Sequence, residues 1–136
     1  MKSDEPKFER GKAKMFTFKR VIASAINSVN GLKYAYTNEQ SMSLHGVGTI
    51  FAIAMSIFLK INFNEWTFIL LASVFVLSIE LLNTSVEAIV DLITDEYHDL
   101  AKIAKDCGSA ATFVSTLSYV IICAYIFIPK LWVMIR

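Results

Sequence analysis

Three long apolar runs dominate the chain, and each is close to the length that crosses a membrane. The runs cover residues 44–61, 66–93 and 110–128. A helix needs about 20 mostly apolar residues to cross a hydrocarbon core of about 30 Å. Only the short stretch "NFNE" separates the first two runs, so we expect them to form an antiparallel hairpin. The pattern therefore predicts an all-α membrane protein with three transmembrane helices.

Residues 16–36 follow a different pattern, in which apolar residues recur at steps of three and four between basic and amide residues. Such a pattern is typical of an amphipathic helix on the membrane surface, and a simple anchor would share it. Residues 1–15 are polar and basic, and we expect a flexible tail there. The length of the chain predicts a single domain over residues 1–136.

The basic residues lie mainly on one side of the predicted spans. The chain carries 13 Lys and Arg against 12 Asp and Glu, so its net charge of +1 gives no sign of a nucleic-acid partner. Eight basic residues precede the first span, two lie between the second and third, and three lie on the other side. The positive-inside rule then places the N-terminus and the second connection in the cytoplasm.

The second apolar run ends in a polar stripe, "ELLNTSVEAIVD". Its acidic and amide residues are three or four positions apart, so they share one helix face. These residues are Glu80, Asn83, Glu87 and Asp91. If the helix starts near Trp66, Glu80 lies about 21 Å along the axis, in the inner leaflet. A carboxylate in hydrocarbon is costly, so its presence there indicates a function.

Further charged residues follow the stripe in "DEYHDLAKIAKDCGSAA", residues 95–111, where we expect a helical stretch to end before Gly108. Carboxylates beside lysine residues suit a complex of Mg²⁺ with a polyphosphate. A carboxylate in the inner leaflet can take a proton from an alcohol that is located there. The chain has no GxxxxGK[ST] motif, so a nucleotide would bind without a P-loop. These residues point to a phosphotransferase that acts on a lipid alcohol.

Other interpretations of the stripe stay open at this point. Glu80 could bind a polar group on a neighbouring helix, or it could relay protons in a small proton-coupled transporter. The chain could also be a non-catalytic membrane subunit. An assay of ATP hydrolysis with and without a lipid alcohol would distinguish a lipid kinase from a transporter and from a non-catalytic subunit.

The stripe and the connection after it resemble the signature of small bacterial integral-membrane lipid kinases, the diacylglycerol kinase and undecaprenol kinase family. The similar positions are Glu80, Asn83, Glu87 and Asp91, then Glu96-Tyr97-His98 and Ala104-Lys105-Asp106. A weaker similarity covers "GLKYAYTNEQSMSLH", residues 31–45. The resemblance implies a homotrimer of three-span subunits in the bacterial inner membrane. It also implies phosphorylation of diacylglycerol to phosphatidic acid, or of undecaprenol to undecaprenyl phosphate, with ATP and Mg²⁺.

The same resemblance implies roles for individual residues. Glu80 would be the general base for the lipid hydroxyl, Asn83 would support the site, and Ser109 would lie near the pocket of that hydroxyl. Glu39 and Glu87 would bind Mg²⁺. The residues that would contact ATP and its phosphates are Arg20, Glu39, Glu87, Glu96, His98, Lys105 and Asp106.

The resemblance does not decide between diacylglycerol and undecaprenol as the lipid substrate. "GSAA", residues 108–111, resembles the diacylglycerol kinase branch, whereas "NEW", residues 64–66, and "IFIPKLW", residues 126–132, resemble the undecaprenol kinase branch. Asn27 stands where some relatives carry an aromatic residue that faces the nucleotide. Both candidate substrates are membrane alcohols with a hydroxyl near the interface, so the catalytic residues do not separate them.

Overall fold

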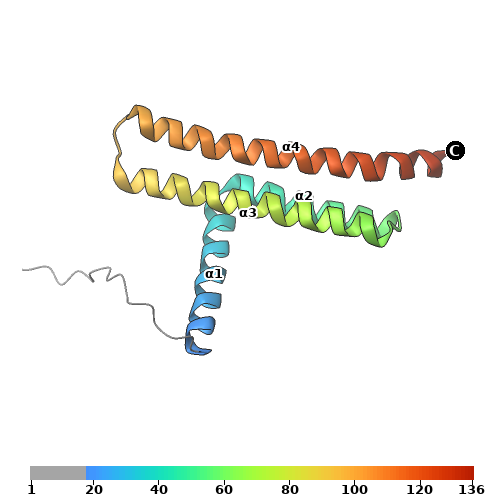
Figure 1. The fold of residues 1–136 in the computed structure, drawn as a ribbon, viewed down its shortest axis with the longest axis horizontal. Helices are drawn as coiled ribbons and strands as arrows, with labels where there is room; N and C mark the ends of the chain where they lie inside the picture. The colour runs from blue at the N-terminus through green and yellow to red at the C-terminus, as the bar shows by residue number, and fades with distance from the viewer. Residues whose placement is uncertain (1–17) are drawn as a thin grey trace, which may run out of the picture. The chain divides into compact units, whose positions relative to one another are not determined.

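The computed structural model describes residues 18–136, which form four α-helices (Figure 1). The helices are α1, Phe18–Asn38; α2, Gln40–Phe58; α3, Phe63–Ile93; and α4, Asp99–Ile135. No strand occurs within residues 18–136, and α2, α3 and α4 are each long and apolar enough to cross a membrane. The predicted all-α class with three candidate spans is confirmed.

Helix α1 occupies most of the region that was predicted as a surface helix, residues 16–36. Residues 1–17, which include the predicted tail, lie outside the described residues. The chain divides into two compact units, one that ends at Gly31 and one that comprises Leu32–Arg136. The location of α1 at a membrane surface stays a prediction.

The largest difference from the predicted boundaries concerns α4. The sequence predicted that a helical stretch would end before Gly108 and that a separate span would cover residues 110–128. Helix α4 instead runs without a break from Asp99 to Ile135. A glycine inside a helix costs only about 1 kcal/mol relative to alanine. Gly108 also gives room to α3, because a Cβ atom at this position would lie 2.2 Å from Asn83 Oδ1.

The short connection after α2 produces the predicted hairpin. Lys60 turns the chain with a positive φ of 49°, and Asn62 then caps α3. Asn62 Oδ1 accepts a hydrogen bond from the Glu65 backbone N–H at 3.0 Å, and Glu65 Oε2 accepts one from the Asn62 backbone N–H at 2.7 Å. This reciprocal capping box fixes where α3 begins. Helices α2 and α3 are therefore antiparallel, and the start of α2 lies beside the second half of α3.

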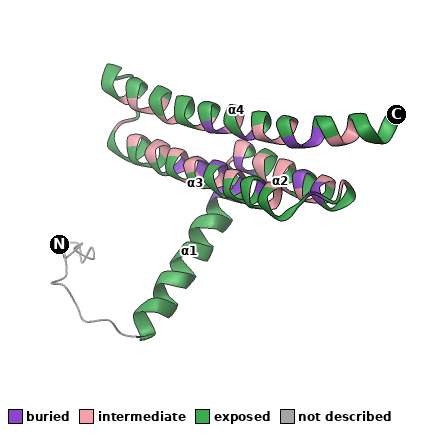
Figure 2. Cartoon of the chain, turned by 45° about the vertical axis from the view of Figure 1, so that its right-hand side comes forward, coloured by how far each residue is buried: buried purple, intermediate pink, exposed green. Residues whose placement is uncertain are grey.

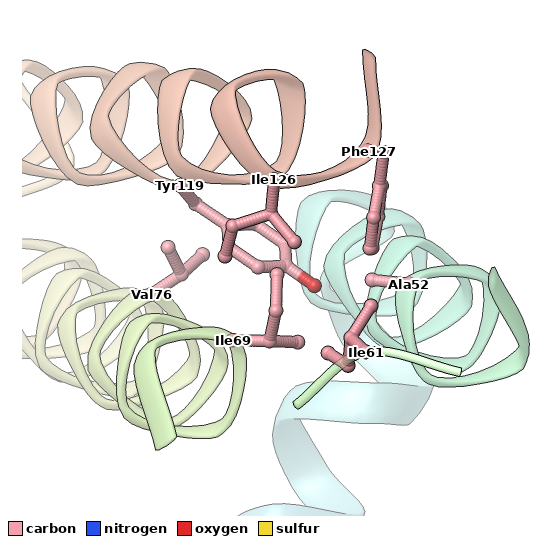
Figure 3. Close-up of a cluster of buried hydrophobic side chains, with 7 residues drawn as sticks. All are labelled: Ala52, Ile61, Ile69, Val76, Tyr119, Ile126 and Phe127. Atoms are coloured by element: carbon pink, nitrogen blue, oxygen red, sulfur yellow. The ribbon is translucent and has the colours of Figure 1, made fainter. Parts of the chain in front are cut away.

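The core of the Leu32–Arg136 unit lies between α2, α3 and α4 (Figure 3). Its buried side chains are Ala52, Ile61, Ile69, Val76, Tyr119, Ile126 and Phe127. The hydroxyl groups of Ser73 and Tyr119 are hydrogen-bonded at 3.1 Å, and this contact joins α3 to α4. The outward faces of the three helices are largely exposed (Figure 2), and many of the exposed residues are large and apolar. Such an extended apolar surface is typical of a protein that lies in a membrane.

The lengths of the helices place the polar stripe at the edge of this core. Helix α2 has 19 residues and α3 has 31, which correspond to lengths of about 28 Å and 46 Å. Because α2 ends and α3 begins at the same short connection, α3 continues for several turns past the start of α2. These last turns of α3 and the first turns of α4 carry the charged residues.

Candidate functional site

Glu80 is a buried carboxylate on α3, with only 1% of its side chain exposed. Ser41 and Glu80 are equally distant from the hairpin connection, so the hairpin brings them together, and Ser41 Oγ donates a hydrogen bond to Glu80 Oε1. Glu80 Oε2 has no hydrogen-bond partner and lies 3.8 Å from His45 Nε2. An unpaired buried oxygen is costly. Glu80 therefore keeps one oxygen available for a further partner.

Glu80 Oε2 is one of several buried polar atoms without a hydrogen-bond partner in the described part of the chain. The group consists of Glu80 Oε2, Asn83 Oδ1, Thr84 Oγ1 and Thr112 Oγ1. Three of these atoms belong to residues within about one turn of α3, and Thr112 lies one turn after Gly108, where α4 approaches Asn83. Most buried polar groups in proteins are paired. A group of unpaired atoms on facing helices is what a binding site for a polar molecule requires.

Glu87 lies one turn after Asn83, and the two side chains are joined. Asn83 Nδ2 donates a hydrogen bond to Glu87 Oε1 at 2.7 Å, and both residues are half-buried. This contact orients the Glu87 carboxylate from within its own helix. The residues of the polar stripe therefore lie on one face of α3, as predicted. Glu80 is at the buried end of this face, and Glu87 is nearer its exposed end.

Glu39, the other predicted Mg²⁺ ligand, is the extended residue between α1 and α2. It is the N-cap residue of α2, but its side chain makes no capping hydrogen bond. Within residues 18–136, no three His, Cys, Asp or Glu side chains are grouped so that they could hold a metal by themselves. Mg²⁺ commonly takes only one or two protein carboxylates and completes its shell with water and substrate phosphates. Glu39 and Glu87 offer carboxylate oxygens of the kind that Mg²⁺ takes, and their role as its ligands stays a prediction.

A charged hollow of about 520 Å³ lies where α3, the connection after it and α4 meet. It brings together four of the residues predicted to contact ATP, namely Glu96, His98, Lys105 and Asp106. The chemistry of this lining is mixed, with carboxylates, amines and an imidazole in one place. A nucleotide offers both phosphate oxygens and hydrogen-bond donors, so the hollow suits a ligand of this kind.

Two ion pairs organise the hollow. Lys105 Nζ donates to Asp91 Oδ1 at 2.5 Å and ties α4 to α3, whereas Lys102 pairs with Asp106 inside α4. His98 has a structural role as well, because its Nδ1 accepts a hydrogen bond from the Leu100 backbone N–H and caps α4. The amine of Lys105 is thus held between the two helices.

Ser109 is exposed on α4, directly after Gly108. Arg20 belongs to the unit of the chain that ends at Gly31, and its role stays a prediction.

Sequence reasoning missed Ser41 and His45. They are four residues apart, so they lie on one face of α2. Counting back from the predicted hairpin connection places Ser41 opposite Glu80, and this count was possible from the sequence alone. The pairing of Asp91 with Lys105 had no comparable signal, because it depends on how α3 and α4 face each other.

The features above define a class of protein: a helical membrane protein in which a buried carboxylate lies close to a charged hollow. Comparison with known proteins identifies the family. The family model described as prokaryotic diacylglycerol kinase matches residues 26–127. The chain belongs to the prokaryotic diacylglycerol kinase family. This confirms the expected class of lipid kinase and gives no support to the alternative of a proton-coupled transporter.

Individual relatives lead to the same family. The chain is 35% identical to the diacylglycerol kinase of Escherichia coli (strain K12) over 104 residues, which cover 76% of this chain and 85% of that protein. It is 34% identical to the undecaprenol kinase of Bacillus subtilis (strain 168) over 112 residues, which cover 82% of this chain and 91% of that protein. A diacylglycerol kinase of Helicobacter pylori (strain ATCC 700392 / 26695) is 33% identical over 105 residues, or 77% of this chain and 82% of that protein.

Proposed function

We propose that this chain transfers the γ-phosphate of ATP to the hydroxyl group of a membrane lipid alcohol, either diacylglycerol or undecaprenol. The observation that carries the proposal is Glu80, a fully buried carboxylate with one unpaired oxygen, on an apolar helix that leads into a charged hollow. One substrate reaches such a site from the membrane and the other from water. Relatives named diacylglycerol kinase and undecaprenol kinase support this choice of substrates.

In the proposed reaction, Glu80 Oε2 takes the proton from the lipid hydroxyl. The lipid oxygen attacks the γ-phosphorus in line. The O–H bond of the lipid breaks, a bond between the lipid oxygen and phosphorus forms, and the bond from the γ-phosphorus to the bridging oxygen breaks to release ADP. General-base help of this kind is worth about 10²–10⁴-fold in rate. Positioning and charge neutralisation contribute the rest.

The nucleotide occupies the charged hollow in this proposal. Lys105, with Arg20, neutralises phosphate oxygens, while Glu96, His98 and Asp106 hold the remainder of the nucleotide. The ion pair with Asp91 supports the role of Lys105, because it keeps the amine at the junction of α3 and α4. A lysine side chain binds phosphate groups well because it carries a compact positive charge and three hydrogen-bond donors.

Glu39 and Glu87 would hold the Mg²⁺ that accompanies ATP, and this ion would supply neutralisation of phosphate charge. Asn83 supports the proposal, because its hydrogen bond at 2.7 Å fixes the direction of the Glu87 carboxylate. Ser109, which is exposed on α4 directly after Gly108, would lie near the pocket of the lipid hydroxyl.

The proposal includes the bacterial inner membrane as the location, with the N-terminus and the connection after α3 in the cytoplasm. The excess of basic residues before α2, together with Lys102 and Lys105 at the start of α4, supports that orientation. It also includes a homotrimer with active sites built between neighbouring subunits. The exposed apolar side chains of α2, α3 and α4 are compatible with subunit contacts as well as with lipid.

The experiment is transfer of labelled γ-phosphate by the purified protein in mixed micelles. Diacylglycerol and undecaprenol are offered side by side with ATP and Mg²⁺, and parallel samples contain a chelator or no lipid. We expect labelling of at least one lipid that disappears with the chelator, and the preferred lipid identifies the branch. A well-folded protein that labels neither lipid would mean that the proposed function is wrong and would favour a non-catalytic membrane subunit.

A further inference from the structure

Ser41 has no part in the mechanism above, although it contacts the proposed base directly. Its hydroxyl crosses from α2 to α3 and donates to Glu80 Oε1. Other serine residues of the long helices behave differently. Ser56, Ser85 and Ser118 each donate to the carbonyl oxygen four residues earlier in their own helix.

The position of Ser41 at the start of α2 explains this difference. Helix α2 begins at Gln40, and Glu39 before it has extended backbone angles of −108° and 116°. The carbonyl oxygen four residues before Ser41 therefore does not belong to the same helix. Because that acceptor inside α2 is missing, the Ser41 hydroxyl is available for a partner on another helix. The hairpin places Glu80 there.

The hydrogen bond distinguishes the two oxygens of Glu80. Oε1 is occupied by Ser41, whereas Oε2 is buried without a hydrogen-bond partner and faces His45 at 3.8 Å. A carboxylate held through one oxygen cannot rotate freely, so the direction of the other oxygen is restricted. Preorganised groups of this kind contribute to catalysis because they need no rearrangement during the reaction.

We propose that Ser41 is a positioning residue for phosphoryl transfer, which holds Glu80 Oε1 so that Oε2 is the oxygen that takes the proton from the lipid hydroxyl. This inference rests on the proposed function of Glu80 as the base. It predicts that the Ser41 hydroxyl affects the rate of the chemical step. It also predicts little effect on the binding of either substrate, because Ser41 contacts the base and not the substrates.

The test compares three variants with the wild-type chain in the labelled-phosphate assay, with the preferred lipid and with Mg²⁺-ATP varied in turn. Ser41→Ala removes the hydroxyl, and Ser41→Thr keeps it. Ser43→Ala is the matched control, because Ser43 is exposed on the same turn of α2 and donates only to the Tyr36 carbonyl oxygen. Thermal unfolding of every variant in micelles reports on folding.

We expect Ser41→Ala to lower kcat by roughly 10- to 100-fold, the range for loss of one hydrogen bond to a charged group. Both KM values should stay close to those of the wild type, and the variant should remain folded at the assay temperature even if its unfolding midpoint falls. Ser41→Thr should recover most of the rate, and Ser43→Ala should equal the wild type. This combination separates positioning of Glu80 from a loss of folded protein, which the unfolding curve would show.

Three results would overturn the inference while the kinase function stands. These are a kcat for Ser41→Ala within about twofold of the wild type, an equal loss in Ser41→Ala and Ser41→Thr, or a loss that follows reduced stability. A wild-type protein that folds but transfers no phosphate would instead remove the proposed function, and the inference with it. The wild-type arm therefore tells the two failures apart.

Discussion

Helix α3 carries an asparagine and a glutamate at its start, Asn62 and Glu65, and a second such pair in its second half, Asn83 and Glu87. In the first pair, each residue satisfies the other through the capping box, and Glu65 also pairs with Lys130 of α4 at 3.0 Å. In the second pair, Asn83 donates to Glu87, but Asn83 Oδ1 is buried without a partner. In the first pair, both side chains accept hydrogen bonds from backbone N–H groups, whereas in the second pair the side-chain oxygen of Asn83 has no partner.

This difference separates polar residues that stabilise the helix from polar residues that belong to the candidate site. The first pair supplies partners for backbone N–H groups that every helix start leaves unpaired. The second pair leaves hydrogen-bonding capacity unused next to Glu80, which lowers stability because a buried polar atom without a partner costs about 1–3 kcal/mol. Such a cost is typical of active sites, where stability is given up for function. Four experiments test this comparison, from the largest expected effect on activity to the smallest.

Glu80→Gln should nearly abolish phosphoryl transfer. The amide has the same shape as the carboxylate but cannot act as a base, so we expect a loss of about 10²–10⁴-fold in kcat. Folding and ATP binding should stay intact, which thermal unfolding and a nucleotide-binding assay in micelles would show. Retention of more than about a tenth of the wild-type rate would contradict the assignment of Glu80 as the base.

Glu87→Gln should raise the Mg²⁺ concentration needed for half-maximal activity, because one of the two proposed carboxylate ligands loses its charge. The measurement is a Mg²⁺ titration of the transfer rate at a fixed ATP concentration. Glu65→Gln is the matched control from the first pair, and its titration should coincide with that of the wild type. If the Glu87→Gln titration does not shift either, Glu87 is not a metal ligand.

Gly108→Ala should lower the transfer rate on the order of tenfold, since small misplacements of site residues are costly. The new Cβ atom would lie 2.2 Å from Asn83 Oδ1 and 3.3 Å from Asn83 Cγ, so Asn83 must move away from its position beside Glu87. Gly48→Ala is the control, because a Cβ atom there meets nothing within 4 Å. Equal rates for both variants would show that the close approach of α3 and α4 is not needed for activity.

Asn62→Ala should destabilise the protein by about 1 kcal/mol, as is usual for loss of an N-cap side chain. The activity of the folded protein should not change, because Asn62 lies at the opposite end of α3 from the charged hollow. Asn83→Ala should have the opposite profile, with reduced activity and little loss of stability. Thermal unfolding and transfer rates of the two variants, measured together, decide whether the two pairs really differ in purpose.

The sequence alone determined the class and the main parts of this protein. Each of the three apolar runs of membrane length predicts a helix, because in hydrocarbon the backbone N–H and C=O groups find hydrogen-bond partners only within their own helix. The spacing of three and four residues put Glu80, Asn83 and Glu87 on one face of α3, because the helical period depends only on the chain itself. The resemblance of the stripe and its connection then identified the family that the comparisons confirm.

Only the tertiary structure decided which faces meet. The helical period says that residues share a face, but it does not say how far a helix is rotated toward its neighbour. That rotation results from side-chain packing between helices. It brings Ser41 to Glu80, pairs Lys105 with Asp91, and makes Gly108 a point of close approach within a continuous α4. These contacts join residues far apart in the chain, so no local pattern in the sequence could reveal all of them.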